Sequence, residues 1–280
     1  EQIRLLVAVR CGELWVPQLA RQLATLDQML DGRLAINIIS SDVPGEMLSS
    51  EDRYQRTRET MHSLRDLLNG ESVSVHGEFL NFEVEPPGAR TVSGRSPLFY
   101  FGGLSEPARA VAAECADVFL MWPNTLPEVQ KVLSDMRVRA ATFDRTLRFG
   151  YRVHVIVRES EGAAIDASRR LLSKLDAAEG ARIRAQSLDS TSTGVRAQGD
   201  LRESADADGF AEANLWTGIG RARSGCGAAI VGDPDQVLNK LKEYMALGIE
   251  AFILSGYPHE EECDLFARYV LPELDHAALS

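Results

Sequence analysis

The stretch PLFYFGGLSEPARAVAAECADVFLMW, residues 97–122, decides the fold class because it contains a strand, a helix and a second strand in succession. The apolar runs 97–103 and 117–122 are typical of buried β-strands. Between them, residues 105–116 predict a helix that follows a Gly-Gly turn. Alternation of strands and helices favours a parallel sheet, either open and doubly wound or closed into a barrel.

The same alternation continues on both sides of this stretch. Strands are predicted over 4–9, 33–40, 148–157 and 251–258, and helices over 17–30, 49–70, 126–143, 161–178 and 233–248. Residues 72–84 predict a β-hairpin insertion. A closed barrel needs about eight strands, and because the chain begins with Glu1 rather than Met, we expect the two that are lacking to precede it. Residues 1–280 are expected to form a single domain.

Residues 179–213 break this rhythm, since they are polar, charged and rich in Gly, Ser and Asp. A segment of this length without strands or helices is usually functional or disordered. We interpret it as a mobile lid within the domain, and a disordered insertion is the alternative.

Composition excludes several classes of function. The net charge of −11 argues against nucleic acid as the main partner. No apolar run approaches the roughly 18 residues of a membrane helix, and no signal peptide is visible, so we expect a cytoplasmic protein. The four cysteines form no CxxC pair, which favours reduced thiols over a disulfide or metal framework. Neither a dinucleotide-binding glycine motif nor a P-loop occurs.

Ligands of parallel α/β proteins bind at the carboxyl ends of the strands. Ser40 ends one predicted strand, and Gly102, Gly103 and Ser105 follow the next and open a helix. Small residues at a helix N-terminus let backbone N–H groups approach a phosphate. An ordinary Gly-Gly turn with a serine cap is the alternative.

Arg152 and His154 lie two residues apart in an otherwise apolar strand and therefore share one face of it. Arginine offers a fork of donors to a planar anion, and histidine can hold or move a proton near neutral pH. A structural arginine with a buried carboxylate partner is the alternative for Arg152. Trp122, at the end of the strand 117–122, either lines a pocket or belongs to the core.

Two further segments carry candidate residues. The glycine-rich segment 214–234 follows the predicted lid and contains Arg223, which could reach an anion. The strand 251–258 ends near Tyr257 and His259. The acidic run after His259 is typical of a helix start rather than of a metal site.

Five stretches together resemble the two-component, flavin-dependent alkanesulfonate monooxygenases of the bacterial luciferase-like family. They are LATLDQMLDGRLAINIISS, LFYFGGLSEPARAVAAECADVFLMW, RFGYRVHVIVRE, NLWTGIGRARSGCGAAIVGDP and AFILSGYPHEEE. The similarity covers nearly the whole chain, with the stretches in order and closely matching in spacing.

The resemblance implies a TIM (β/α)8 barrel with insertions and a mobile lid, whose first two strands, with an active-site Cys and a His, precede this chain. It implies reduced FMN as a co-substrate with O2, delivered by an NAD(P)H-dependent flavin reductase. The implied reaction cleaves the carbon–sulfur bond of a sulfonate to give an aldehyde and sulfite. A homodimer or homotetramer is also implied.

Several residues of this chain match, by position, residues that have known roles in the family. The resemblance implies catalytic roles for Arg152, His154, Arg223 and Tyr257, and substrate binding by Trp122, His259 and the two arginines. For the flavin, it implies Ser40, Tyr54, Gly102, Gly103 and Ser105. No metal site is implied.

Three departures from the family pattern bear on these roles. Leu104 stands in the phosphate turn where a second hydroxyl residue is commoner, and Ser40 stands in place of the commoner Thr-Gly ending. The loop VRCGELWVPQ replaces a smaller one and brings Glu13 and Trp15 towards the substrate side. Trp15 is therefore a further substrate-binding candidate, and a hydroxylated sulfonate such as a sulfosugar becomes an alternative to simple alkanesulfonates.

Two other functions are compatible with the sequence. A deazaflavin (F420)-dependent dehydrogenase on the same barrel would transfer hydride without oxygen. A non-catalytic flavin-binding paralogue is compatible with the changes at Leu104 and Trp15, although the presence of Arg152, His154 and Arg223 speaks against it.

Overall fold

The computed structural model describes residues 3–186, 192–223, 225–277 and 279. The chain is divided into two compact units. The first comprises Glu1–Phe119 and Arg139–Leu147, and the second comprises Leu120–Val138 and Arg148–Leu279. That the two units together form a single domain, as the sequence predicted, stays a prediction.

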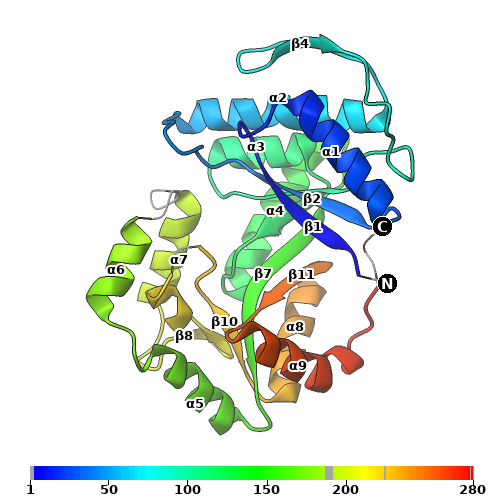
Figure 1. Cartoon of the computed structure of the whole chain (residues 1–280). Helices are drawn as coiled ribbons and strands as arrows, with labels where there is room; N and C mark the ends of the chain where they lie inside the picture. The colour runs from blue at the N-terminus through cyan, green and yellow to red at the C-terminus, as the bar shows by residue number, and fades with distance from the viewer. Residues whose placement is uncertain (1–2, 187–191, 224, 278, 280) are drawn as a thin grey trace. The chain divides into compact units, whose positions relative to one another are not determined.

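The first unit contains parallel strands in the order β1 (Leu5–Arg10), β2 (Leu34–Ile39), β5 (Phe99–Phe101) and β6 (Val118–Met121), of which β1 and β2 are labelled in Figure 1. Of β6, only Val118 and Phe119 belong to this unit. Adjacent strands in this order pair in parallel. Ile36, Phe99 and Phe101 are buried almost completely, as is typical of strands in a parallel sheet. The strand–helix–strand pattern predicted over 97–122 is confirmed, with α3 (Glu106–Cys115) between β5 and β6.

The helices of the first unit also follow local sequence signals. The N-cap Ser49 accepts a hydrogen bond from the backbone of Asp52 at the start of α2 (Ser50–Asn69), and Gly70 ends this helix with a φ of 86°. Helix α2 contacts α1 (Val16–Met29) and α3. The β-hairpin predicted over 72–84 is confirmed as β3 (Val73–His76) and β4 (Asn81–Val84), beside α2 in Figure 1.

The second unit is organised around β7 (Arg148–Val157), which pairs in parallel with both β10 (Ala229–Gly232) and β11 (Ala251–Ser255). Two short antiparallel strands, β9 (Leu215–Trp216) and β8 (Phe210–Glu212), extend the sheet beyond β10. The sequence predicted four helices of this unit, namely α4 (Leu126–Ala141), α5 (Glu161–Leu172), α8 (Pro234–Leu247) and α9 (His259–Tyr269). The last three residues of α4 belong to the first unit. The chain ends after the 3-10 turn η2 (Leu271–Glu273).

Strand β10 was not predicted from the sequence. Its four residues lie in the glycine-rich segment 214–234, which gives no alternation long enough to recognise. Pairing with the buried strand β7 decides its conformation, since the backbone groups of a buried segment must find hydrogen-bond partners.

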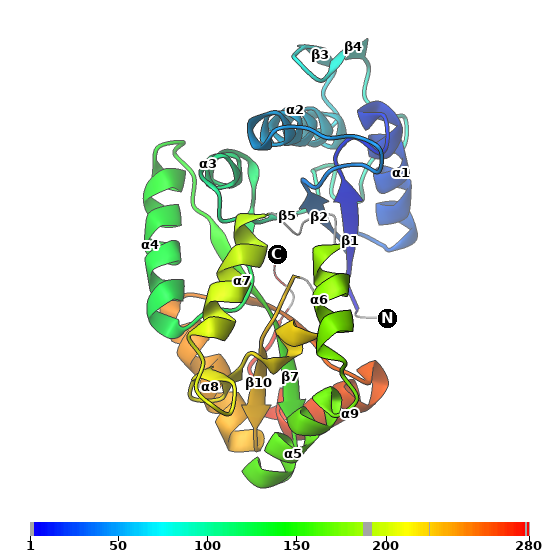
Figure 2. The same cartoon turned by 90° about the vertical axis from the view of Figure 1, so that its left-hand side faces the viewer.

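The segment 179–213 is not the loop that its composition predicted. It contains most of α6 (Ala177–Ala185), all of α7 (Thr193–Glu203) and β8, while residues 187–191 lie outside the described part of the chain. The side chains of Asp176 and Ser192 cap the two helices. Figure 2 shows α6 and α7 as neighbouring helices, and both contact the 3-10 turn η1 (Gly218–Arg221). The mobility of this segment stays a prediction.

Two predictions from composition can be compared with the structure. Across the described residues, no helix combines the length and apolar character needed to cross a bilayer. All four cysteines are free thiols, and Cys11, Cys115 and Cys226 are buried. The thiols therefore agree with the prediction of reduced cysteines.

Candidate active site

His154 lies at the centre of the second unit, on the middle strand of three parallel ones. In the strand register it stands beside Ala229 of β10 and Ser255 of β11. Its side chain is fully buried, and its Nδ1 atom lies 2.8 Å from the Ser255 hydroxyl oxygen. Its Nε2 atom is also buried and has no hydrogen-bond partner among the described residues. A buried polar atom of this kind is costly unless a ligand or water satisfies it.

Burial lowers the pKa of His154 to about 4, and the positive charges of Arg223 and Arg152 act in the same direction. Backbone carbonyls of Cys226 and Ser255 oppose this shift in part. The imidazole is therefore neutral at pH 7. It can offer a lone pair or an N–H group to a ligand without adding charge.

Tyr257, His259 and Arg223 lie around this histidine. The ring centroids of His154 and Tyr257 are 5.5 Å apart, and those of Tyr257 and His259 are 4.9 Å apart. Arg223 Nη1 donates to the Tyr257 hydroxyl at 2.5 Å. Tyr257 thus contacts His154 of β7, and it also contacts His259 and Arg223.

Arg152 joins this cluster through its place on β7. It lies two residues from His154, so both side chains project from the same face of the strand. No carboxylate forms an ion pair with Arg152 within the described part of the chain, which disfavours the structural alternative. Its backbone carbonyl accepts a bond from the Cys226 thiol at 3.4 Å, which attaches the segment before β10 to β7.

Trp122 is half-buried and follows β6. A Cβ atom added at Gly194 would lie 3.1 Å from the indole ring, and one at Gly225 would lie 3.6 Å from it. The first turn of α7 and the segment around Gly225 therefore pack against the ring. Trp122 therefore lies under α7 rather than at the centre of the core, and its role in lining a substrate site stays a prediction.

The residues predicted to hold a flavin lie in the first unit. Ser40 follows β2 and Ser105 precedes α3, and both hydroxyl oxygens are buried without a partner among the described residues. A Cβ atom on Gly103 would lie 2.6 Å from that of Ala108 and 3.3 Å from the Tyr54 hydroxyl. The turn is thus closely covered by α3 and Tyr54, and it has no room for a side chain at Gly103.

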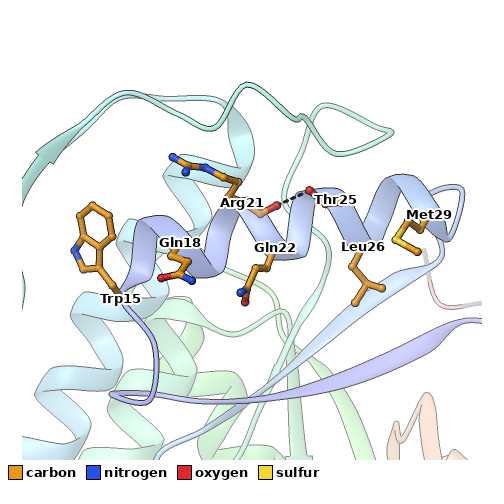
Figure 3. A pocket seen from close by; sticks show the side chains of 7 residues that line it. All are labelled: Trp15, Gln18, Arg21, Gln22, Thr25, Leu26 and Met29. Atoms are coloured by element: carbon orange, nitrogen blue, oxygen red, sulfur yellow. Dashed lines mark hydrogen bonds between the residues drawn. The ribbon is translucent and has the colours of Figure 1, made fainter.

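Trp15 is placed differently from the other candidates. It precedes α1 and is 56% exposed, and its ring lies 6.1 Å from that of Phe82 on the β-hairpin. It lines a surface pocket on the outer side of α1 together with Gln22, Leu26 and Met29 (Figure 3). A role of Trp15 in substrate binding stays a prediction.

The family model described as luciferase-like monooxygenase matches residues 1–251. The chain belongs to the luciferase-like monooxygenase family. It is 59% identical over its whole length to a protein from Novosphingobium aromaticivorans named sulfoquinovose monooxygenase, of which it covers 79%. It is 46% identical to a protein of the same name from Agrobacterium fabrum, again over its whole length and over 73% of the relative.

The luciferase-like fold extends to solved structures of low sequence identity. EDTA monooxygenase from Chelativorans sp. BNC1 matches 96% of this chain and 72% of its own, with a TM-score of 0.76 and 16% identity. The α/β fold with a mostly parallel sheet is thus that of the luciferase-like TIM-barrel monooxygenases, and membership of the family makes this protein a flavin-dependent monooxygenase.

The first unit contains groups suited to the flavin phosphate that the resemblance in sequence implies. Ser105 makes no capping hydrogen bond to its own helix, so its hydroxyl remains available at the N-terminus of α3. The dipole of a helix N-terminus favours an anion. Glu106, which would oppose that anion, is paired with Arg139 at 2.5 Å. Gly102 and Gly103 complete the turn.

Sequence reasoning missed two residues of this luciferase-like site. Ser255 is the last residue of β11 and lies two residues before Tyr257 in the strand predicted over 251–258, so the two-residue period could have identified it. Gln198 on α7 donates to the carbonyl of Pro123 at 2.7 Å and accepts from the backbone of Gly227 at 2.9 Å. No sequence signal could have indicated Gln198, because both its partners are distant in the chain.

Proposed function

We propose that this luciferase-like enzyme uses reduced FMN and O2 to cleave the carbon–sulfur bond of a sulfosugar such as sulfoquinovose. The observation that carries the proposal is the 59% identity, over the whole chain, to a relative named sulfoquinovose monooxygenase. The substrate carbon leaves as an aldehyde and the sulfonate as sulfite, while FMN, water and one proton complete the balance. The cluster of half-buried Arg152, Arg223 and Tyr257 around the buried His154 supports an anionic substrate.

The two arginines hold the sulfonate. A guanidinium offers several donors in a fixed fork, and its charge persists in a buried site. Because Arg223 donates to the Tyr257 hydroxyl, the clamp also fixes the phenol, whose own proton remains available to the substrate. Neutral His154 directs its unpartnered Nε2 atom to the substrate, where it holds or moves a proton.

The first unit holds the flavin in this proposal. Ser40, Ser105 and the backbone of Gly102 and Gly103 bind the phosphate, and Tyr54 lies beside them. When bound, reduced FMN supplies the two electrons that activate O2. An NAD(P)H-dependent flavin reductase provides it, and the enzyme works as a homodimer or homotetramer in the cytoplasm, where NAD(P)H is present. The segment 179–213 acts as a lid that excludes water from the reaction.

The test is sulfite release in air with FMN, NAD(P)H and a flavin reductase. Sulfoquinovose, a simple alkanesulfonate and glucose, which lacks the sulfonate, are compared at equal concentration. We expect sulfite and oxygen uptake with sulfoquinovose and much less with the alkanesulfonate. Oxygen uptake without sulfite would refute desulfonation but keep the monooxygenase. Substrate oxidation that requires F420 and no oxygen would favour the dehydrogenase.

A further inference from the structure

A second group of arginines surrounds a cavity of about 230 Å³ in the second unit. Arg184 comes from α6, Arg202 from α7 and Arg223 from the segment between η1 and β10. No carboxylate is among the described residues that line this cavity. Neither the sequence patterns nor the relatives' names assign a role to Arg184 or Arg202.

Each of these arginines is held by a neutral oxygen. Arg184 donates to the carbonyl of Arg221, and Arg202 donates to that of Gly220 at 3.3 Å. Arg223 donates to the Tyr257 hydroxyl. The bonds of Arg184 and Arg202 orient their guanidinium groups without neutralising them. Burial and, after it, the positive charges of Arg202 and Arg221 lower the pKa of Arg184.

The cavity is built into the fold rather than formed by exposed side chains. Gln198, which is 6% exposed, lines it and spans from Pro123 to Gly227 through its two hydrogen bonds. Gly220 and Gly227 line it with backbone, and Gly220 donates to the Gly227 carbonyl at 3.0 Å. These bonds fix α7 to the segment between η1 and β10, and they thereby set the spacing between Arg202 and Arg223.

We propose that this cavity is an oxyanion-binding site in which Arg184 and Arg202, together with Arg223, bind a tetrahedral oxygen anion. Converging positive charges are costly in a partly buried cavity, and a bound anion relieves that cost through charge-assisted hydrogen bonds. The anion is the sulfonate of the substrate, an assignment that rests on the proposed function. A sulfonate presents three oxygens to the donors and therefore fits these arginines.

Calorimetric titration with inorganic sulfate at constant ionic strength tests the site without turnover. We expect Arg184→Gln and Arg202→Gln each to weaken sulfate binding about tenfold, as expected for loss of one charged hydrogen bond. Arg182→Gln is the matched control, because Arg182 lies two residues away on α6 and pairs with Glu179 outside the cavity. It removes the same charge and should leave sulfate binding unchanged.

Equal sulfate affinity in all these variants would overturn the proposal. Because Arg184 also attaches α6 to η1, melting temperatures are measured for each variant, and Arg202→Lys is added. The lysine variant keeps the positive charge and should recover most of the affinity for sulfate. Such a recovery would show that the weaker binding of Arg202→Gln is not caused by misfolding. A lysine variant that binds as weakly as Arg202→Gln despite a normal melting temperature would contradict a site based on charge.

Two further measurements identify the source of the anion. A raised KM for sulfoquinovose in Arg202→Gln, with FMN affinity unchanged, supports the sulfonate. Weaker binding of FMN but not of riboflavin, which lacks the phosphate, would place the flavin phosphate in this cavity and overturn its assignment to the sulfonate. In an enzyme that releases sulfite, a change in sulfate binding with unchanged KM and unchanged FMN affinity would show an adventitious ion only and overturn the site. Absence of sulfite release from every sulfonate would refute the proposed function, and the sulfate titration would then decide only whether the cavity binds an oxyanion.

Discussion

The two units of the chain offer two different solutions for an anion. In the first, Ser40, Ser105 and the Gly103 turn present neutral hydroxyls and backbone at the start of a helix. In the second, Arg152 and Arg223 place full charges around the neutral imidazole of His154. Hydroxyl and backbone N–H dipoles suit an anion that does not vary, such as a cofactor phosphate. They carry no net charge, so they repel one another little when the anion is absent. Full charges bind more strongly but remain costly when the site is empty, so the two regions should respond to mutation by very different amounts.

Removal of a charge from the second unit should have the largest effect. We expect Arg152→Ala or Arg223→Ala to lower kcat/KM for the sulfonate by about 100- to 1,000-fold, as loss of a donor to a developing oxyanion does. Steady-state sulfite release checks this. Arg169→Ala, at an exposed arginine paired with Asp208, is the control and should change little. An unchanged KM with activity retained in the first two variants would refute the sulfonate clamp.

The buried histidine predicts a pH-dependent stability. Its pKa is lower in the folded protein, about 4, than the ordinary 6.5, so the unfolded chain binds its proton first as the pH falls. The folded state should therefore lose roughly 3 kcal/mol between pH 6.5 and pH 4 from this group and keep that contribution fully above pH 6.5. Urea unfolding of the native protein and of His154→Asn over this range measures it. In the variant, the free energy of unfolding should not show this part of the dependence on pH. An equal dependence on pH in both proteins would contradict the lowered pKa of His154.

Ser255 should matter less than the groups that it positions. Its hydroxyl fixes the His154 ring through one hydrogen bond of 2.8 Å, and such a bond contributes up to about 1.5 kcal/mol. We expect Ser255→Ala to lower kcat about tenfold with the KM for the sulfonate nearly unchanged. Ser255→Thr, which retains the hydroxyl, should restore most of kcat. An equal loss in both variants would indicate a packing role instead.

The smallest effect is expected at the neutral site of the first unit. Ser105→Ala removes a hydroxyl that has no partner among the described residues, so folding stability should not fall. The Kd for FMN should rise about fivefold, which corresponds to roughly 1 kcal/mol. Fluorescence titration with FMN and riboflavin separates a phosphate contact from a general loss. An equal rise in Kd for FMN and riboflavin would indicate that Ser105 contacts a part of the flavin other than its phosphate.

A large part of the fold could be predicted because its signals are local. The runs ending at Ser40 and near Gly102 alternate with capped helices, and each parallel strand places its carboxyl end at the edge where ligands bind. The two-residue spacing of Arg152 and His154 likewise predicted a shared face. The strand β10 and the helices α6 and α7 could not be predicted, since their short segments lack a clear apolar period.

The sequence by itself determined most of the strands and helices, the residues at the strand ends and the face of β7 that Arg152 and His154 share, because each depends on neighbours a few positions away. Only the tertiary structure decided that Ser255 meets Nδ1 of His154, that Arg223 reaches Tyr257, and that Arg184 and Arg202 line one cavity. These groups come from different strands and helices. Their meeting depends on strand register and helix packing, which are set by burial of the whole core rather than by any local pattern.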